Sequence, residues 1–326
     1  MIHTLTGEHS ESLLVHFRRA ELLREEAVGL TAIDLNSRQL CDLELLLNRG
    51  FYPLNGYLGP DDYKRVLDEM RLTDGTVWPM PICLDVSAAV AAGLQTGQRI
   101  ALNDQEGFLL AILSVSAVWQ PDKSLEAELI YGTNIPDLHP GVHILFNKTG
   151  EWYVGGQVEG LCLPIHYDFR NLRATPAETH RRFTQYGWRR VLGFHTREYL
   201  HCAHREMVLA VAREINANIF IQPVAGLDHP GNRDHYTHVH CYQEFARQFP
   251  ANMTFLGIMP LADRFAGPRE ALWHAIIRKN YGCSHFMVAC DHGDPFAQSA
   301  GPLFYPPRVA QQLVADMAAE TGIEMV

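Results

Sequence analysis

Residues 193–204 read GFHTREYLHCAH, and this stretch decides how the second half of the chain folds. The preceding RRVL has the composition of a buried strand, and the following REMVLAVAREI has the spacing of an amphipathic helix. A turn between a strand and a helix needs only a glycine and a capping residue. The three histidines, the arginine and the glutamate of this stretch therefore indicate a chemical site.

The alternation of strand-like and helical segments continues along the chain. Apolar runs at 218–224, 253–260 and 283–290 are each separated from the next by a helical stretch. This pattern is typical of a parallel α/β sheet, in which ligands bind at the carboxyl ends of the strands. We therefore predict a parallel sheet flanked by helices over residues 169–326.

The first part of the chain has a different pattern. Short strand-like runs, such as FLLAILSVSAVW at 108–119, alternate with Gly and Pro turns. A few helical stretches interrupt them, among them SRQLCDLELLLNRG at 37–50. These features predict a compact, β-rich domain over residues 1–168.

The composition narrows the class of protein. The 326 residues carry a formal net charge of -10, whereas nucleic acids and anionic membranes require a basic surface, so we expect neither as a partner. The seven cysteines include no C-x-x-C pair, which is typical of reduced thiols. The first residues lack a basic start followed by an apolar core, so we expect no signal peptide, and the longest apolar run is too short to span a bilayer. We expect a cytoplasmic protein.

Polar side chains follow each of the four predicted strands of the second domain. His195 to His204 follow the first, 225–240 the second, Arg264 and GPREALWH the third, and DHGDP at 291–295 the fourth. Because parallel strands end at the same edge of a sheet, we expect these groups to line one crevice.

His201 and His204 lie three residues apart, so both should project from one face of the first helical turn. A helix N-terminus has free N–H groups and a partial positive charge, which favour a phosphate. Two surface histidines, or two metal ligands, are the alternatives. The chain has neither a G-x-x-x-x-G-K-[ST] loop nor a G-x-S-x-G elbow, which indicates nucleotide binding without a P-loop lysine.

GFHTREYLHCAH resembles the Q-T-R-N-P-x-H-x-x-H motif of the sulfate adenylyltransferases, or ATP sulfurylases. AGPREALWHAIIRKNYGCSHFMVACDH at 266–292 resembles two further motifs of that family, A-G-P-R-E-A-L-W-H and G-R-D-H. PVAGLDHPGNRDHYTHVHCY at 223–242 is similar to the family's V-G-x-T-K-P-G-D segment, and residues 37–86 look like its N-terminal domain. The resemblance covers nearly the whole chain.

This resemblance implies a PUA-like, β-rich N-terminal domain followed by a Rossmann-like nucleotidyltransferase domain. It implies a reaction in which sulfate, or a related small acid, attacks the α-phosphate of ATP and pyrophosphate leaves. The expected cofactor is Mg²⁺, which accompanies ATP, and the chain is expected to form a homo-oligomer. The catalytic residues that the resemblance implies are Thr196, Arg197, Glu198, His201 and His204.

The resemblance also assigns binding residues. It places the acceptor at His195, Arg197 and Gly293. It places the nucleotide at Arg197, His201, His204, Gly226, Arg264, Ala289, Cys290, Asp291 and His292.

The sequence departs from the family mostly at these positions. His195 stands where the family has Gln, Glu198 where it has Asn, and Cys290 where it has the Arg of G-R-D-H. The remaining departures are Gln222 for His, His229 for Lys, and His238 and His240 for Arg. One unit charge pair at 4 Å is worth about 4 kcal/mol at a partly shielded site. We therefore expect a remodelled acceptor pocket.

Two other interpretations remain open from the residues. His195, His229, His238, His240 and Cys290 could gather a metal ion, because imidazole and thiolate are borderline or soft ligands. The chain could also be a paralogue that binds a nucleotide without turnover. The retained Thr196, Arg197, His201 and His204 favour an enzyme over complete decay.

Overall fold

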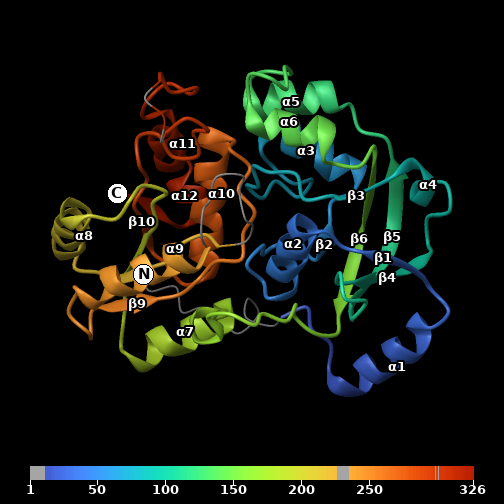
Figure 1. Cartoon of the computed structure of the whole chain (residues 1–326), viewed down its shortest axis with the longest axis horizontal. Helices are drawn as coiled ribbons and strands as arrows, with labels where there is room; N and C mark the ends of the chain where they lie inside the picture. The colour runs from blue at the N-terminus through green and yellow to red at the C-terminus, as the bar shows by residue number, and fades with distance from the viewer. Residues whose placement is uncertain (1–11, 226–234, 298, 300) are drawn as a thin grey trace. The chain divides into compact units, whose positions relative to one another are not determined.

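The computed structural model describes residues 12–225, 235–297, 299 and 301–326, and its chain divides into two compact units, Met1–Ile165 and His166–Val326 (Figure 1). Within the described residues, no helix has the length and the apolar composition needed to cross a bilayer.

The first unit is built on a six-stranded sheet, as its alternating turn-rich sequence predicts. Strands β4 to β6 are antiparallel neighbours, β1 is parallel to β4, and both β2 and β3 are antiparallel to β6. The predicted strand at 108–119 is confirmed as β5, in which Leu110 to Leu113 are buried. The bounds are β1 Thr31–Asp34, β2 Gly56–Tyr57, β3 Leu84–Val86, β4 Arg99–Asn103, β5 Leu109–Trp119 and β6 Trp152–Gly160.

The helices of this unit begin where the sequence offers caps. The helix predicted at SRQLCDLELLLNRG is confirmed as α2, and Asn36 and Gln39 form a capping box that satisfies two N–H groups at its start. The bounds are α1 Phe17–Ala27, α2 Ser37–Leu47, α3 Pro60–Glu69, α4 Ala88–Ala91, α5 Lys123–Tyr131 and α6 Pro140–Asn147.

The second unit contains a five-stranded sheet in which every neighbouring pair is parallel. The four predicted strands are confirmed as β7 to β10. A fifth strand, β11, pairs with β10 over only two residues, too few to give a recognisable apolar run. The bounds are β7 Val191–Phe194, β8 Asn218–Ile221, β9 Thr254–Leu256, β10 His285–Phe286 and β11 Glu324–Met325.

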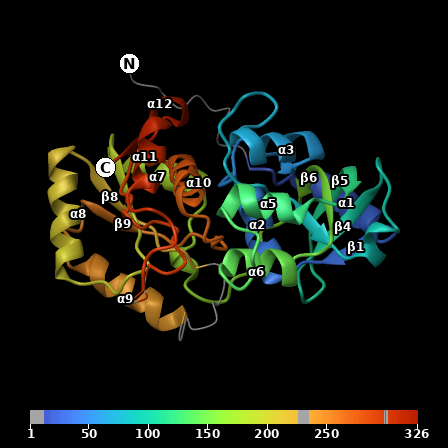
Figure 2. The ribbon, with the colours of Figure 1, turned by 90° about the horizontal axis from the view of Figure 1, so that it is seen from above.

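Helices cover both faces of this parallel sheet (Figure 2). On one face, α8 and α9 pack against Leu192, Phe194, Ile219 and Ile221 in one buried apolar cluster. Each such side chain contributes about 1.5–3 kcal/mol when it leaves water. The bounds are α7 Pro176–Gln185, α8 Cys202–Glu214, α9 His235–Arg247, α10 Gly267–Asn280, α11 Val309–Asp316 and α12 Ala318–Thr321, with a short 3₁₀ helix over Arg170–Leu172.

The opposite face of β7 is packed so closely that a side chain at Gly193 would have to displace its neighbours. A Cβ atom at this position would lie 3.1 Å from both Arg278 Cδ and Cys283 Sγ. The glycine therefore lets α10 approach the central strand, which brings residues of α10 to the edge where β7 ends.

The strand order β11-β10-β7-β8-β9 has its reversal point between β7 and β10. After β7 the chain winds outward through β8 and β9, and it then returns to place β10 on the other side of β7. In open α/β sheets such a reversal leaves a crevice at the carboxyl ends of the two strands, because the following loops diverge. The residues after Phe194 and after Phe286 must therefore face a common space.

Candidate functional site

A cavity of about 660 Å³ opens at this point, where β7 and β10 end. The turn after β7 and the first residues of α8 form one wall, the segment after β10 forms another, and α10 and the start of α11 complete the lining. The lining residues that bear on function are His195, Thr196, Arg197, Glu198, His201, His204, His274, Ala289, Cys290, Asp291, His292, Gly293 and Arg308.

The cavity is lined by members of three of the four predicted groups: the residues after β7, the segment after β10, and His274 of the GPREALWH segment that follows β9. Arg264, which follows β9, is not among the lining residues. Its guanidinium donates to Ala262 O at 2.9 Å and lies 5.7 Å from the centre of the Trp273 ring. Gly226 and His229, which follow β8, lie outside the described residues.

Tyr242 of α9 holds the backbone of the turn after β7. Its hydroxyl donates to Thr196 O at 2.6 Å and accepts the Thr196 N–H at 3.1 Å. The Thr196 hydroxyl in turn accepts the Glu198 N–H at 3.0 Å. These bonds satisfy backbone groups that neither the strand nor the helix can satisfy, so the turn has a defined shape before any ligand enters.

Arg197 is held by two buried carboxylates. Its guanidinium lies 3.0 Å from Asp263 Oδ2 and 3.4 Å from Glu270 Oε1, and it covers the Phe265 ring at 4.9 Å. Burial opposes the charge, but the attraction of Asp263 and then Glu270 prevails, so the pKa of Arg197 is raised. Burial raises the pKa of Glu270, and the positive charge of Arg197 offsets part of this rise. The arginine is thus fixed at the cavity wall as a permanent cation.

His201 and His204 stand at the N-terminus of α8, as the sequence predicts. Their ring centres are 4.0 Å apart, and no side chain within the described residues caps this helix end. Burial and then the neighbouring His201 lower the pKa of His204, while Glu198, 3.2 Å from its Nε2, acts in the opposite direction. The helix N-terminus favours an anion at this point. The Glu198 carboxylate and the two imidazoles also lie close enough together to be metal ligands, so the metal alternative for this pair stays open.

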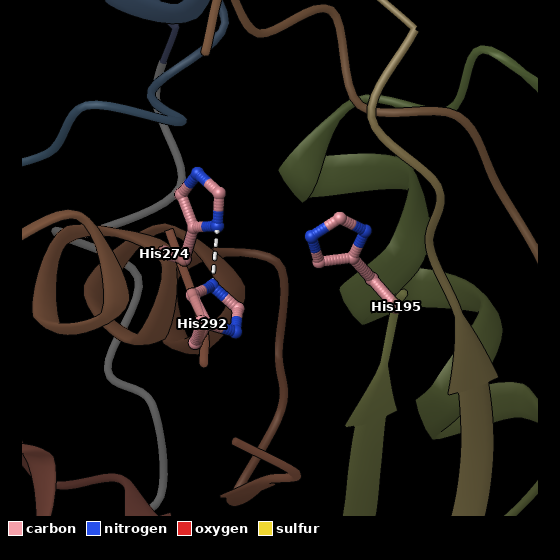
Figure 3. A group of neighbouring side chains, drawn as sticks. All are labelled: His195, His274 and His292. Carbon is pink, nitrogen blue, oxygen red and sulfur yellow. Dashed lines mark hydrogen bonds between the residues drawn. The ribbon is translucent and has the colours of Figure 1, made fainter. Parts of the chain in front are cut away.

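Three buried histidines meet on the other side of the turn. His195 follows β7, His274 lies on α10, and His292 follows β10 (Figure 3). Burial and then the positive charge of Arg278 lower the pKa of His292 to about 3. Burial also holds the pKa values of His195 and His274 well below the usual value. All three rings are therefore neutral at physiological pH.

The segment after β10 lines the cavity with Ala289 to Asp294. Gly293 has a φ of 75°, and a Cβ atom there would lie 2.8 Å from Gly267 O, so only glycine fits. The exposed Cys290 presents its carbonyl to the Arg308 N–H at 2.9 Å. Burial raises the pKa of Asp291.

The structure does not gather the metal-ligand set considered from the sequence. His238 packs on Tyr242, and His240 packs on Phe169 and bonds Gln243, so neither lines the cavity. Gln222 is fully buried beneath the sheet edge and accepts a bond from Arg278 at its backbone carbonyl.

Sequence reasoning missed several groups at or behind the cavity. His274 and Glu270 belong to GPREALWH, a segment that the sequence analysis places at the crevice without giving its individual residues a role. Asp263 and Arg308 had no signal, because they lie 66 and 111 residues after Arg197 and only folding brings them near the turn.

The fold defines a doubly wound α/β domain with a cavity at the reversal point of the sheet, next to the N-terminus of α8. Residues 170–326 match the family model of the ATP-sulfurylases, and residues 4–162 match that of the PUA-like domains. The chain belongs to the ATP-sulfurylase family.

Individual relatives agree with this assignment. The chain is 48% identical over 310 residues to the sulfate adenylyltransferase of Kluyveromyces lactis and 46% identical to that of Saccharomyces cerevisiae. These matches cover 95% of the chain but only 61% and 60% of the two relatives. A solved structure, the hexameric APS kinase from Thiobacillus denitrificans, matches with a TM-score of 0.76 and 31% identity, over 97% of this chain and 54% of that one.

Proposed function

We propose that this chain transfers the adenylyl group of ATP to sulfate or a related small oxyanion and releases pyrophosphate. The observation that carries the proposal is the cavity in which Arg197, His201 and His204 surround an uncapped helix N-terminus. The relatives named as sulfate adenylyltransferases support the choice of reaction. ATP would enter as its magnesium complex, and Mg²⁺ would offset part of the phosphate charge.

In this reaction an acceptor oxygen attacks the α-phosphorus, and the bond from that phosphorus to the bridging oxygen of pyrophosphate breaks. The chain needs no covalent intermediate, because catalysis can come from position and from charge stabilisation. We propose that Thr196 and the bonds around it shape the turn, and that Arg197 binds the acceptor and the α-phosphate. His201 and His204 would donate hydrogen bonds to the phosphates as charge develops.

The nucleotide would lie along the segment after β10, with Ala289, Cys290, Asp291 and His292 as its contacts. This segment and the start of α8 line the same cavity. The proposed contacts at Gly226 and Arg264 have less support, because Gly226 lies outside the described residues and Arg264 bonds elsewhere.

We further propose that the acceptor end of the cavity is remodelled. Arg197 shares its charge with two carboxylates, Glu198 adds a negative charge, and Cys290 supplies no charge where the family motif has arginine. Arg308 is exposed and lines the same cavity, and its guanidinium would supply part of the missing positive charge. The acceptor-binding residues would be His195, Arg197 and Gly293.

Pyrophosphate release from ATP tests this function, with sulfate and a panel of other oxyanions and small organic acids as acceptors. The reverse reaction, from adenylyl sulfate and pyrophosphate, should be measured alongside. We expect turnover in at least one direction and nucleotide binding by calorimetry. Binding without turnover for every acceptor would mean a non-catalytic paralogue, and absence of both would overturn the proposal.

Three organisational features are proposed with it. The domains would run over 1–168 and 169–326, and limited proteolysis should then cut first between them. The seven free cysteines support a reducing, cytoplasmic location, which fractionation can test. The similar APS kinase is hexameric, which supports self-association of this chain as well, and light scattering can test it.

A further inference from the structure

The imidazole of His195 is buried and forms no hydrogen bond with any of the residues that the structure describes. It is 7% exposed, its Nδ1 atom is enclosed, and no described residue bonds to either ring nitrogen. A buried polar group without a partner costs about 1–3 kcal/mol. A bound water or ion is one way in which such a group finds a partner.

The other two histidines offer their nitrogens to the same point. His274 Nδ1 and His292 Nε2 lie 2.9 Å apart, and one nitrogen from each of the three rings falls within 4.8 Å of the others. Figure 3 shows the His195 ring facing this pair across a short gap. Imidazole nitrogens bind a metal such as zinc at about 2.0–2.1 Å. Two nitrogens on one ion therefore lie about 2.9–3.4 Å apart when the nitrogen–metal–nitrogen angle is between about 90° and the tetrahedral value. The His274–His292 pair has this spacing in a hydrogen bond, which an ion would replace, and the rings would have to turn for all three nitrogens to point at that ion.

The protonation state of these rings suits metal binding. A metal ligand must be an unprotonated imidazole, and burial keeps the pKa values of all three rings low. No proton therefore has to be removed from a cationic ring before an ion can bind at neutral pH.

A buried carboxylate lies near the His274 ring, slightly beyond hydrogen-bond distance. Glu270 Oε1 lies 3.6 Å from His274 Nε2, on the side of that ring away from His292. A carboxylate behind a ligating histidine orients the ring and raises its basicity. The buried guanidinium groups of Arg197 and Arg278 repel a cation here, and the buried carboxylates of Asp263 and Glu270 oppose that repulsion.

We propose that His195, His274 and His292 bind one divalent transition-metal ion. Three imidazoles without thiolates suit zinc, iron, nickel or copper rather than magnesium or calcium. The three side chains occupy one face of the ion and all line the 660 Å³ cavity, so its remaining positions face space that water or a small oxyanion can enter. His195 is itself a departure from the family motif, and it is the residue that turns a histidine pair into a triad.

The test is a titration of untagged, chelator-treated protein with Zn²⁺ by calorimetry and with Co²⁺ by visible absorbance. We expect one equivalent to bind, with Co²⁺ bands typical of nitrogen and oxygen ligands. His195→Gln should weaken the metal affinity at least about 100-fold. Loss of a metal ligand should reduce the affinity at least as much as loss of a residue that only hydrogen-bonds to a ligand. Circular dichroism should show an unchanged fold, since His195 bonds no described residue.

His285→Gln is the matched control. His285 is a buried histidine of the same unit, but it contacts Ser284 and Glu324 and does not line the cavity. Its replacement should leave metal affinity unchanged. No stoichiometric binding to wild-type protein, or equal affinity in His195→Gln, would overturn the proposal. Because no nucleotide is present, the result is independent of whether the chain transfers adenylyl groups.

Discussion

The hydroxyl of Tyr242 forms two hydrogen bonds with the backbone of Thr196, one as donor at 2.6 Å and one as acceptor at 3.1 Å. Tyr242 is 1% exposed and lies on α9, whereas Thr196 belongs to the turn between β7 and α8. One buried side chain thus connects a helix of the scaffold to the turn that carries Arg197. The shape of the candidate site depends on a residue that does not line it.

Tyr242→Phe should lower the free energy of unfolding by about 1–3 kcal/mol, because the N–H and C=O of Thr196 lose their shared partner. The turnover number should fall more than the KM rises, since the turn loses its shape rather than a ligand contact. Urea unfolding and steady-state kinetics measure the two effects. Tyr236→Phe, at an exposed position of the same helix, is the control, and an equal effect there would contradict the role of Tyr242.

Arg197→Met should destabilise the fold by about 3–5 kcal/mol at neutral pH, because it leaves Asp263 and Glu270 buried without their shared cation. Burial raises the pKa of Glu270, so the folded state keeps that proton to higher pH than the unfolded chain. The associated stability is present at low pH and is lost as the pH rises through the folded pKa.

Removing Arg197 should raise the pKa of Glu270 further, so the deficit should be larger at about pH 8 than at about pH 5. Urea unfolding at both pH values measures this. Arg247→Met removes an exposed arginine that pairs with Glu244 and should change stability by less than about 1 kcal/mol. A deficit in Arg197→Met that does not depend on pH would show that the buried carboxylates are not its cause.

Glu198→Gln should lower the pKa of His204, because the carboxylate that favours its protonated form is removed. It should also tighten pyrophosphate binding several-fold at low salt, since a negative charge leaves the helix N-terminus. NMR titration of the histidine and calorimetry with pyrophosphate provide the measurements. Glu206→Gln changes an exposed glutamate of α8 that pairs with Arg205, and it should alter neither quantity. A His204 pKa that stays constant or rises in Glu198→Gln would refute the coupling.

If the acceptor pocket is remodelled as proposed, sulfate turnover should be poor relative to nucleotide affinity. The triple variant His195→Gln, Glu198→Asn and Cys290→Arg should raise sulfate-dependent pyrophosphate release. Cys290→Arg alone should do little, because Glu198 can neutralise the new charge, so the three effects should not add. Strong sulfate turnover by the wild-type chain, with no gain in the triple variant, would mean that these residues do not set acceptor choice.

Local patterns were sufficient to predict much of the second unit. The apolar runs that became β7 to β10 are short, and helical stretches separate them, so period and length alone distinguish strand from helix. The placement of His201 and His204 at a helix start also follows from local spacing, because residues three apart share one helix face. The two-residue β11 gave no such signal, since its pairing with β10 is a tertiary contact.

The sequence by itself determined the alternation of strands and helices, the turn rich in ionisable groups after β7, and the motifs that indicate the family. Only the tertiary structure decided which of those groups meet. His195 and His292 are 97 positions apart, and the reversal of the sheet between β7 and β10 brings them to one point. The tertiary structure also places His238 and His240 on α9, outside the cavity lining, and brings Asp263 and Glu270 into contact with Arg197. The physical reason is that periodicity reports the local backbone, whereas strand order and close packing of distant segments determine side-chain neighbours.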